Sequence, residues 1–506
     1  MKPRKFRKPK SISSSTNKKK EQSKGSFTES QLRALFEDCL DVQFETHSFG
    51  EEEHKVFFIL CDGMVDDDLY NQLISKRMAD FFAITKQEPY DKETILEKLY
   101  VPSLTEMKTE QEVVSHVFSG KVLILFESLQ LLFSADLANR PQRNPEQTTS
   151  EVTIKGPRDD FIEDLTINIA LIRKRVRTNS LQMRRFEIGR RSLTEVALLF
   201  MDDLADIHVI EQITDSLKKV DIDSIFSGTQ LMELIDKKGS LFPRHDYTGR
   251  PDYAIEALMR GRVVLLIDGV AYAVITPVNL FMLFKTSEDI EYNPYFSTFE
   301  RFIRIGGVVF SAILPALWVA LTTFHQNQIP LILLATVVES RRGLPLPSAL
   351  EAFFMLLIFE LLREAGMRLP IAIGSTLSVI GGLIIGDAAI RAGLTSAAML
   401  VVIALSTIGT FTLLNQSLIG SISLLRILSV VFVSFLGLFG FFLFIYAAWT
   451  YLARIRIFGI PYLALASDLS LTNILQSITR LRTNLVKKRP AMLKPKDPTR
   501  QGEDQQ

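Results

Sequence analysis

The stretch RFIRIGGVVFSAILPALWVALTTF, residues 301–324, decides the fold of this chain. Its apolar run from residue 303 onward is about 20 residues long, the length that an α-helix needs to cross the hydrocarbon of a bilayer. Arg301 and Arg304 stand at its start, and such positive residues favour the cytoplasmic side. Pro315 lies inside the run, where a neighbouring helix can satisfy the carbonyl that loses its hydrogen bond. The sequence therefore predicts a membrane-spanning helix that begins on the cytoplasmic side.

Further apolar segments follow as far as residue 454. Those long enough to cross are residues 348–364, 371–391, 397–414 and 424–451, whereas residues 329–338 are too short and are predicted to be re-entrant or interfacial. Trp449 and Tyr451 are interface anchors, and the basic residues after Arg454 place the C-terminus in the cytoplasm. Two cytoplasmic ends require an even number of crossings, but five long segments are counted. Either residues 348–364 do not cross, or residues 329–338 join a neighbour to make a sixth crossing.

Charged side chains are embedded in this apolar block. A charge at the centre of a bilayer costs roughly 2.5 to 3.5 kcal/mol on insertion scales, so each must be paired, near an interface or beside water. Glu351 and Glu360 interrupt a lipid-like helix, and Glu360, Arg363 and Glu364 share one face because they are three and four residues apart. Three interpretations stay open for this face: an ion pair that fixes packing, an aqueous pathway, or a proton-coupling site.

The segment 371–391 carries small residues at intervals of four, a pattern that lets another helix approach closely. These candidate interface residues are Gly374, Ser378, Gly382 and Gly386. Asp387 and Arg391 follow one turn apart, so they form either an ion pair at the helix end or an ion site. This spacing of small residues predicts a helix interface, within the subunit or between subunits.

The part of the chain before residue 301 contains a duplicated α/β pattern. The apolar run 56–60 leads into Cys61-Asp62-Gly63 and a helix, and the run 196–200 leads into Met201-Asp202-Asp203 and a helix. A second pair, residues 120–126 and 261–267, keeps nearly the same offset of about 140 residues. Residues 263–284 resemble a membrane span in length, but Asp268-Gly269 is a hairpin signal, so we expect two strands there. Two similar α/β subdomains are predicted.

Charge distribution completes the domain scheme. The formal net charge is only +1, but the first 25 residues are rich in lysine, without the apolar core of a signal peptide. They form either a solvated tail or a segment that rests on anionic lipid headgroups. Cys39 and Cys61, the two cysteines, suit a reducing compartment. The predicted parts are a disordered tail (1–28), two α/β subdomains (29–148 and 149–300), a transmembrane helical domain (301–456) and a basic cytoplasmic tail (457–506).

Arginines cluster in the second subdomain, at positions 173, 175, 177, 184, 185, 190 and 191. They could bind an anion or an acidic partner, or they could form a solvated face paired with nearby carboxylates. No interleaved aromatic residues indicate nucleic-acid binding. Neither a phosphate-binding loop, nor a metal-ligand spacing, nor a nucleophile and base arrangement is found, so no enzyme activity, cofactor or metal is expected.

Short motifs spread over residues 50–465 resemble those of the A subunits of the GerA family of bacterial spore germinant receptors. The motifs are Gly156-Pro157-Arg158, Phe161 with Glu163, residues 168–175, Gly189-Arg190-Arg191, Leu241-Phe242-Pro243, Arg250-Pro251-Asp252, Leu314-Pro315-Ala316, residues 321–325 and residues 359–366. The resemblance covers most of the chain and is strong because so many motifs occur in order.

This resemblance implies a subunit of the spore inner membrane that acts with a transporter-like B subunit, which binds the nutrient, and a lipoprotein C subunit. It also implies that A subunits oligomerise around a pore for monovalent cations. Glu351, Glu360 or Glu364, repeated around a ring, would give a cation-attracting constriction, with Glu360 facing the axis. The alternatives are a secondary transporter of a small solute, although no inverted repeat is seen in the spans, and a membrane-anchored scaffold.

Overall fold

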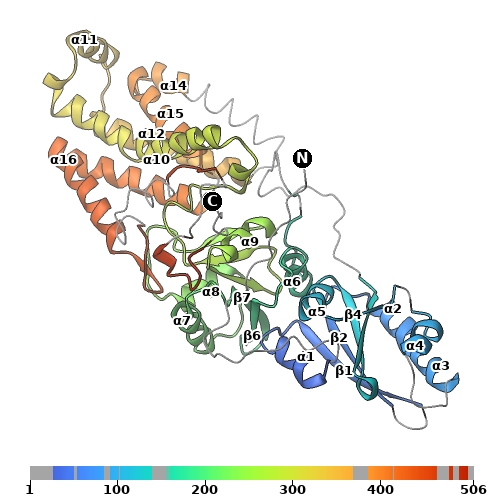
Figure 1. The fold of residues 1–506 in the computed structure, drawn as a ribbon. Coiled ribbons are helices and arrows are strands. Elements are labelled where there is room, and N and C mark those ends of the chain that lie inside the picture. The colour runs from blue at the N-terminus through green and yellow to red at the C-terminus, as the bar shows by residue number, and fades with distance from the viewer. Residues whose placement is uncertain are drawn as a thin grey trace, which may run out of the picture. The chain divides into compact units, whose positions relative to one another are not determined.

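A computed structural model describes residues 27–50, 54–84, 92–101, 103–138, 157, 159–368, 386–413, 415–463, 478–482, 489 and 491–499. The chain divides into two compact units, which are described separately. The sheet unit comprises residues 1–237, 247–277 and 484–506, and the helical unit comprises residues 238–246 and 278–483. Figure 1 shows the strands gathered in the first unit and long helices in the second.

The sheet unit begins with a five-stranded antiparallel sheet in the order β1-β2-β4-β5-β3. Its elements are α1 (Glu29–Leu35), β1 (Val42–Phe49), β2 (His54–Cys61), α2 (Asp67–Leu69), the π-helix Tyr70–Ser75, α3 (Lys76–Ile84), α4 (Lys92–Lys98), β3 (Thr105–Glu106), α5 (Glu110–Val117), β4 (Lys121–Phe126), the 3-10 turn Glu127–Leu129 and β5 (Leu131–Asp136).

The first sheet is buried on both faces. Phe58 and Ile124 belong to a core shared with α3 and α4, whereas their neighbours Phe57 and Leu123 belong to a core shared with α1 and α5. Successive side chains of a strand point to opposite faces, so two covered faces require an unbroken apolar run. This requirement explains the continuous apolar stretch of β2.

A second five-stranded sheet repeats the first. Its order, β6-β7-β9-β10-β8, matches the first strand by strand, and β9 and β10 form the antiparallel hairpin expected around Asp268-Gly269. The elements are α6 (Leu165–Arg173), β6 (Leu181–Ile188), β7 (Thr194–Met201), α7 (Ile207–Lys218), α8 (Gly228–Ile235), β8 (Asp246–Thr248), α9 (Pro251–Met259), β9 (Val263–Ile267) and β10 (Ala273–Thr276). The predicted duplication is confirmed.

One glycine in each repeat occupies the same structural position. Gly120 and Gly261, just before β4 and β9, have φ of 82° and 85°, a conformation that favours glycine. A side chain at either would press against the carbonyl of Met64 or Leu204, in the turn that follows β2 or β7. Both repeats therefore pack the same strand against the same turn.

A buried ion pair joins the two repeats. Arg173, at the end of α6, donates to both carboxylate oxygens of Asp41, at 2.5 and 2.8 Å, and each side chain is only 1% exposed. Arg173 also donates to the carbonyls of Thr178 and Leu181 and lies over the Phe118 ring, 4.1 Å from its centroid. Burial alone lowers the pKa of Arg173, but Asp41 more than reverses that effect, so the guanidinium stays charged.

The helical unit is built from long apolar helices. Its elements are the 3-10 turn Ser287–Ile290, α10 (Pro294–Thr323), the 3-10 turn Gln326–Gln328, α11 (Leu331–Ser340), α12 (Ser348–Arg368), α14 (Gly386–Arg391), α15 (Ala397–Phe411), α16 (Gln416–Arg454), β11 (Arg456–Ile457) and β12 (Ile460–Pro461). By length and composition, α10 and residues 417–454 of α16 could cross a membrane, and α11 and α15 are shorter apolar helices. One core joins α10, α12, α15 and α16.

The start of α10 is fixed by Asp289. Arg301 and Arg304, expected only as a positive flank, both bond to its carboxylate at 2.7 Å. Burial raises the pKa of Asp289, but these arginines outweigh burial and hold the pKa below its usual value. The stabilisation from this site is therefore present at neutral pH and is lost as the pH falls through that lowered value.

The element α16 is a helical hairpin, not one span. Gly437, near its middle, has φ 58° and ψ −139°, which breaks the helix. The rings of Phe432 and Phe444 lie 5.7 Å apart, whereas 12 residues of straight helix rise about 18 Å. Both ends of α16 bond to residues 241–246: Tyr451 accepts from the Leu241 amide at 2.8 Å, and Asn415 donates to Asp246 at 2.7 Å. Residues 424–451 therefore do not form the single continuous helix that the predicted crossing requires.

The buried pair in the sheet unit gives a stability prediction. Asp41→Asn leaves the Arg173 charge without its counter-charge, which we expect to cost about 3 to 5 kcal/mol of unfolding free energy. Thermal unfolding of the purified chain should show a clearly lowered first transition. Asp62→Asn is the control, because its 3.4 Å pair with Arg185 is about 30% exposed on each side and should contribute less than about 1 kcal/mol. Equal shifts for the two variants would contradict the assigned role of Arg173.

The hairpin in α16 gives a second prediction. Gly437→Ala puts a methyl group 2.9 Å from the Phe324 ring at a backbone conformation reserved for glycine, so we expect a loss of about 1 to 3 kcal/mol. Protein abundance and thermal midpoint in detergent measure it. Gly420→Ala in the same element meets open space and should be neutral or slightly stabilising. If both variants behave alike, α16 does not need the turn at Gly437.

Candidate functional site

Three charged side chains meet inside the helical unit. Glu360 and Arg363 lie one turn apart on α12, and their side chains form an ion pair. The second arginine, Arg426, comes from the first arm of α16 and places Nη2 3.5 Å from the Glu360 carboxylate. The spacing of Glu360 and Arg363 predicted that they share one face of α12. The structure adds Arg426 of α16 as a further partner of Glu360.

Hydroxyl groups complete this arrangement. Arg426 is 2% exposed and donates to Ser406 at 3.2 Å and, more weakly, to Thr407 at 3.5 Å, both on α15. Arg363 donates to the hydroxyl of Ser423 at 2.8 Å. These polar contacts tie α12, α15 and α16 together within an apolar unit. We call Glu360, Arg363, Arg426 and the hydroxyls of Ser406, Thr407 and Ser423 the Glu360 cluster.

The Glu360 cluster carries more positive than negative charge. Two guanidinium groups share one carboxylate, and Nε of Arg363 and Nε of Arg426 are buried without a hydrogen-bond partner among the described residues. Glu360 itself is 29% exposed, so its carboxylate reaches the surface of this single chain. A buried charge that is only partly compensated is costly and sensitive to a change in its neighbours. The cluster can thus exchange partners more readily than a closed ion pair can.

Glu351 has a different environment. It is 0% exposed, and one carboxylate oxygen accepts from the amide and hydroxyl of Ser396, each at 2.6 Å, and from the Thr395 hydroxyl at 3.1 Å. The other oxygen lies 3.7 Å from Arg341. Ser396 is the N-cap of α15, so the carboxylate sits at the positive end of that helix dipole. Its contacts join α12 to α15.

The remaining predicted acids form exposed pairs. Glu364 bonds to Arg368 at 2.7 Å, and Asp387 bonds to Arg391 at 2.8 Å, each four residues along its helix. The Asp387 pair corresponds to the helix-end alternative of the sequence analysis. Glu364 is directed to Arg368 and not to the Glu360 cluster, although it shares the helical spacing.

The structure describes only one of the four small residues that were predicted to form a helix interface. Gly374, Ser378 and Gly382 lie outside the described residues, whereas Gly386 packs against Leu400 of α15, since an added methyl would lie 3.2 Å from that side chain. Another pair of helices approaches more closely, and the sequence pattern did not predict it. Gly307 and Gly409 bring α10 and α15 together so tightly that a methyl on Gly409 would lie 2.6 Å from the Gly307 carbonyl oxygen. The glycines at these two positions were the sequence signal that could have predicted this close approach of α10 and α15.

Arg426 was also missed. It stands near the start of an apolar run that was interpreted as a span, so it looked like a flanking residue. The signal that could have found it is its position ten residues after Gln416, between leucine and isoleucine residues, where an arginine needs an internal partner.

Most of the arginine cluster in the sheet unit is paired within the chain. Arg175 bonds to Asp159 at 2.8 Å and Arg190 to Asp221 at 2.5 Å, while Arg173 holds Asp41. These contacts favour the paired-face interpretation over an anion site.

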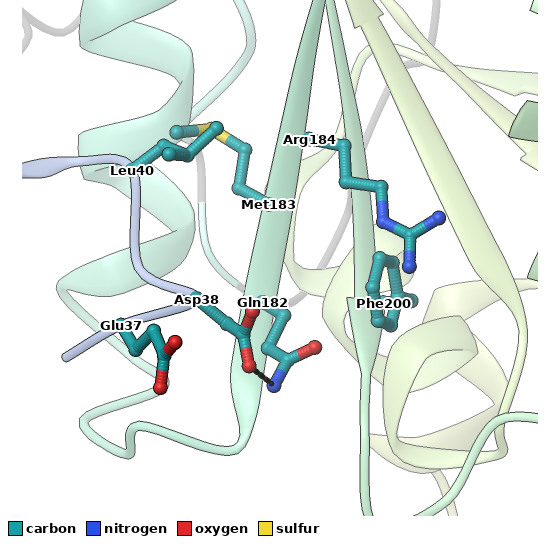
Figure 2. A pocket seen from close by; sticks show the side chains of 7 residues that line it. All are labelled: Glu37, Asp38, Leu40, Gln182, Met183, Arg184 and Phe200. Atoms are coloured by element: carbon teal, nitrogen blue, oxygen red, sulfur yellow. Dashed lines mark hydrogen bonds between the residues drawn. The ribbon is translucent and has the colours of Figure 1, made fainter. Parts of the chain in front are cut away.

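A small hollow lies beside β6 (Figure 2). Its volume is about 120 Å³, and it is lined by Glu37, Asp38, Leu40, Gln182, Met183, Arg184 and Phe200. Gln182 donates to Asp38 across it at 3.0 Å, and Arg184 covers the Phe200 ring, 5.4 Å from its centroid. Ligand pockets usually hold about 300 to 1,000 Å³, so this hollow suits water better than a nutrient molecule.

Comparison with known proteins places the chain in a family. The family described as Bacillus/Clostridium GerA spore germination protein matches residues 30–492. A doubled antiparallel sheet unit followed by apolar helices is thus the architecture of a spore germination protein. The chain belongs to the GerA family.

Individual relatives agree with this assignment. Spore germination protein XA of Bacillus anthracis is 41% identical over 479 residues, covering 94% of this chain and 97% of that protein. Spore germination protein KA of Bacillus subtilis (strain 168) is 30% identical, covering 92% and 86%. The uncharacterized membrane protein YfkQ of the same strain is 32% identical, covering 86% and 84%.

One solved structure matches part of this chain. It is the crystal structure of the N-terminal domain of the A subunit of the Bacillus megaterium spore germinant receptor GerK3, at 22% identity and a TM-score of 0.40. The match covers 51% of this chain and 98% of that one.

Glu351 provides a prediction for the site. Glu351→Gln keeps the shape but removes the charge that faces the start of α15 and Arg341, so we expect a loss of about 1 to 3 kcal/mol in stability. Thermal unfolding in detergent measures it, with Glu339→Gln as the control because the Glu339 pair with Arg342 is exposed. A Glu351→Gln chain as stable as the control would show that this carboxylate does not hold α12 to α15.

Proposed function

We propose that this chain is the A-type membrane subunit of a nutrient germinant receptor, located in the spore inner membrane with B and C subunits. The GerA family match and relatives named spore germination proteins support the role in germination. None of the relatives compared above is named as an enzyme.

The contacts of the helical unit support six crossings. Thr322, at the end of α10, lies 3.4 Å from Ser348 at the start of α12, so α12 returns toward the start of α10. Ser406 of α15 donates to the Ser311 carbonyl of α10, and α15 leads to Asn415, which bonds to Asp246. The described helices α10, α12 and α15 and the two arms of α16 give five crossings, and the predicted crossing at residues 371–391, of which only residues 386–391 are described, makes the count even. This count agrees with two cytoplasmic ends without requiring residues 329–338 to cross.

The Glu360 cluster carries the proposal of a channel. In a ring of identical subunits, Glu360 of each copy would converge on the symmetry axis and attract monovalent cations. The arrangement in this chain, with Glu360 held by Arg363 and Arg426, neutralises that acid and corresponds to a closed gate. Germinant binding to the receptor would then open the gate by withdrawing an arginine. The observation behind this step is the partly exposed carboxylate beside two arginines whose Nε atoms lack hydrogen-bond partners in the part of the chain that the structure describes.

Ion release tests the proposal. Glu360→Gln, expressed with its partner subunits in spores, should reduce germinant-triggered release of monovalent cations at least about tenfold, because the attracting charge is gone. Glu364→Gln, the same change one turn away in an exposed pair, should change it less than about twofold. Protein abundance is measured beside flux, since a misfolded subunit would also lower it. Unchanged flux at normal abundance contradicts the assignment of Glu360.

A double variant separates conduction from packing. Glu360→Gln with Arg426→Gln removes one charge of each sign, so the cluster keeps its net charge. If the carboxylate itself attracts cations, flux stays low although the chain is present at normal abundance. If the pair only fixes α12 against α16, flux returns to the wild-type value, and the helical unit is then better explained as the anchor of a receptor scaffold.

A further inference from the structure

The described part of the C-terminal segment, residues 489 and 491–499, belongs to the sheet unit. Lys496 donates its backbone amide to the Leu204 carbonyl at 3.1 Å and its ammonium group to Asp202 at 3.0 Å. Arg489 donates from Nε to the Met259 carbonyl at 3.1 Å. The segment thus contacts the turn after β7 and the end of α9, two neighbouring parts of the second repeat.

The segment is folded upon itself at this place. The Arg489 amide donates to the Pro498 carbonyl at 2.8 Å, and its guanidinium lies 3.0 Å from Asp497. Asp497 also accepts from the amide and hydroxyl of Thr499, at 2.8 and 2.6 Å. These contacts close a compact loop that presents Lys496 to the turn.

The first repeat uses the equivalent turn in the same way. Asp62 follows β2 as Asp202 follows β7, and it pairs with Arg185 at 3.4 Å. Gly63, the next residue, lies against Thr166 and Ala170 of α6, so tightly that a methyl would reach within 2.9 Å of Thr166. In each repeat, later parts of the chain therefore contact the turn and supply a basic side chain to its aspartate: α6 and Arg185 of β6 in the first repeat, and the C-terminal segment in the second.

We propose that the turn of residues 201–205 is a binding site for the chain's own C-terminal segment, which docks there as a strap. The charges are complementary: the turn carries Asp202 and Asp203, and the segment from 487 to 496 contains five Lys or Arg residues. The main-chain bond from Lys496 to Leu204 fixes the register, and the ammonium group of Lys496 adds an electrostatic contribution that salt would weaken.

The strap lies beyond the last of four covalent passages between the two units, which fall after residues 237, 246, 277 and 483. The chain leaves the sheet unit after residue 277, directly after β10, and returns at residue 484. The longer segment of the helical unit, residues 278–483, is therefore preceded and followed in the sequence by parts of the sheet unit. The next step rests on the proposed receptor function. A displacement of α16 during gating would be transmitted to the turn after β7 through this segment.

Hydrogen exchange of the full-length chain in detergent tests the docking directly. In the wild type, the Lys496 amide should exchange at least about tenfold more slowly than in Asp202→Lys, where like charges repel the strap. Asp202→Lys combined with Lys496→Asp exchanges the two charges and should restore the protection. Asp221→Lys is the matched control, because Asp221 pairs with Arg190 and not with the strap.

Two results would overturn the docking. An unprotected Lys496 amide in the wild type would show that the strap does not dock. Protection that disappears on dilution to a single-chain species would show that the segment binds a second copy instead of its own turn.

Spores carrying the same variants test the coupling separately. If the strap transmits gating, Asp202→Lys should slow the germination response at normal abundance, and the charge-exchanged pair should restore it. A normal response despite lost protection would overturn the coupling alone. Hydrogen exchange does not depend on ion conduction. Failure of the channel proposal can therefore be distinguished from failure of the docking.

Discussion

A buried arginine joins separate elements in each unit of this protein: Arg173 in the sheet unit and Arg426 in the helical unit. A guanidinium that leaves water needs a counter-charge and partners for its remaining donors, or its burial costs several kcal/mol. Arg173 meets that requirement, with two bonds to Asp41, two carbonyl acceptors and an aromatic face. Arg426 meets it only in part, because it shares Glu360 with Arg363 and its Nε has no hydrogen-bond partner among the described residues. The first arrangement suits a fixed joint, and the second suits a site that changes partners.

The two repeats of the sheet unit share one local design. Both repeats have the same strand order and the same glycine before their fourth strand in sequence, and both use the turn after the second strand as a docking surface. In the first repeat that surface takes α6, which also brings Arg173 to Asp41. In the second it takes the C-terminal strap. One local design therefore produces the joint between the repeats and the attachment of the chain's end.

Much of the fold could be predicted from local patterns. The apolar runs of β2 and β7 recur at one offset, and Asp268-Gly269 distinguishes a hairpin from a membrane span, since turn chemistry acts over a few residues. The reversal at Gly437 could not be predicted, because glycine is common in apolar helices and only its φ of 58° against the Phe324 ring reveals the turn. Glu360 and Arg363 were found by their spacing. Arg426 was not, because its partner lies about 65 residues away and only tertiary packing brings the two together.

The central claim is that Glu360 lines a cation path formed by several subunits, and that arginines of the same chain keep this path closed. Electron cryomicroscopy of the receptor extracted into lipid nanodiscs tests this claim most directly. The account predicts a closed ring of this subunit in which Glu360 of every copy faces the common axis. A single copy, or a ring whose Glu360 side chains all face lipid or stay enclosed within their own protomers without a continuous opening, would contradict it.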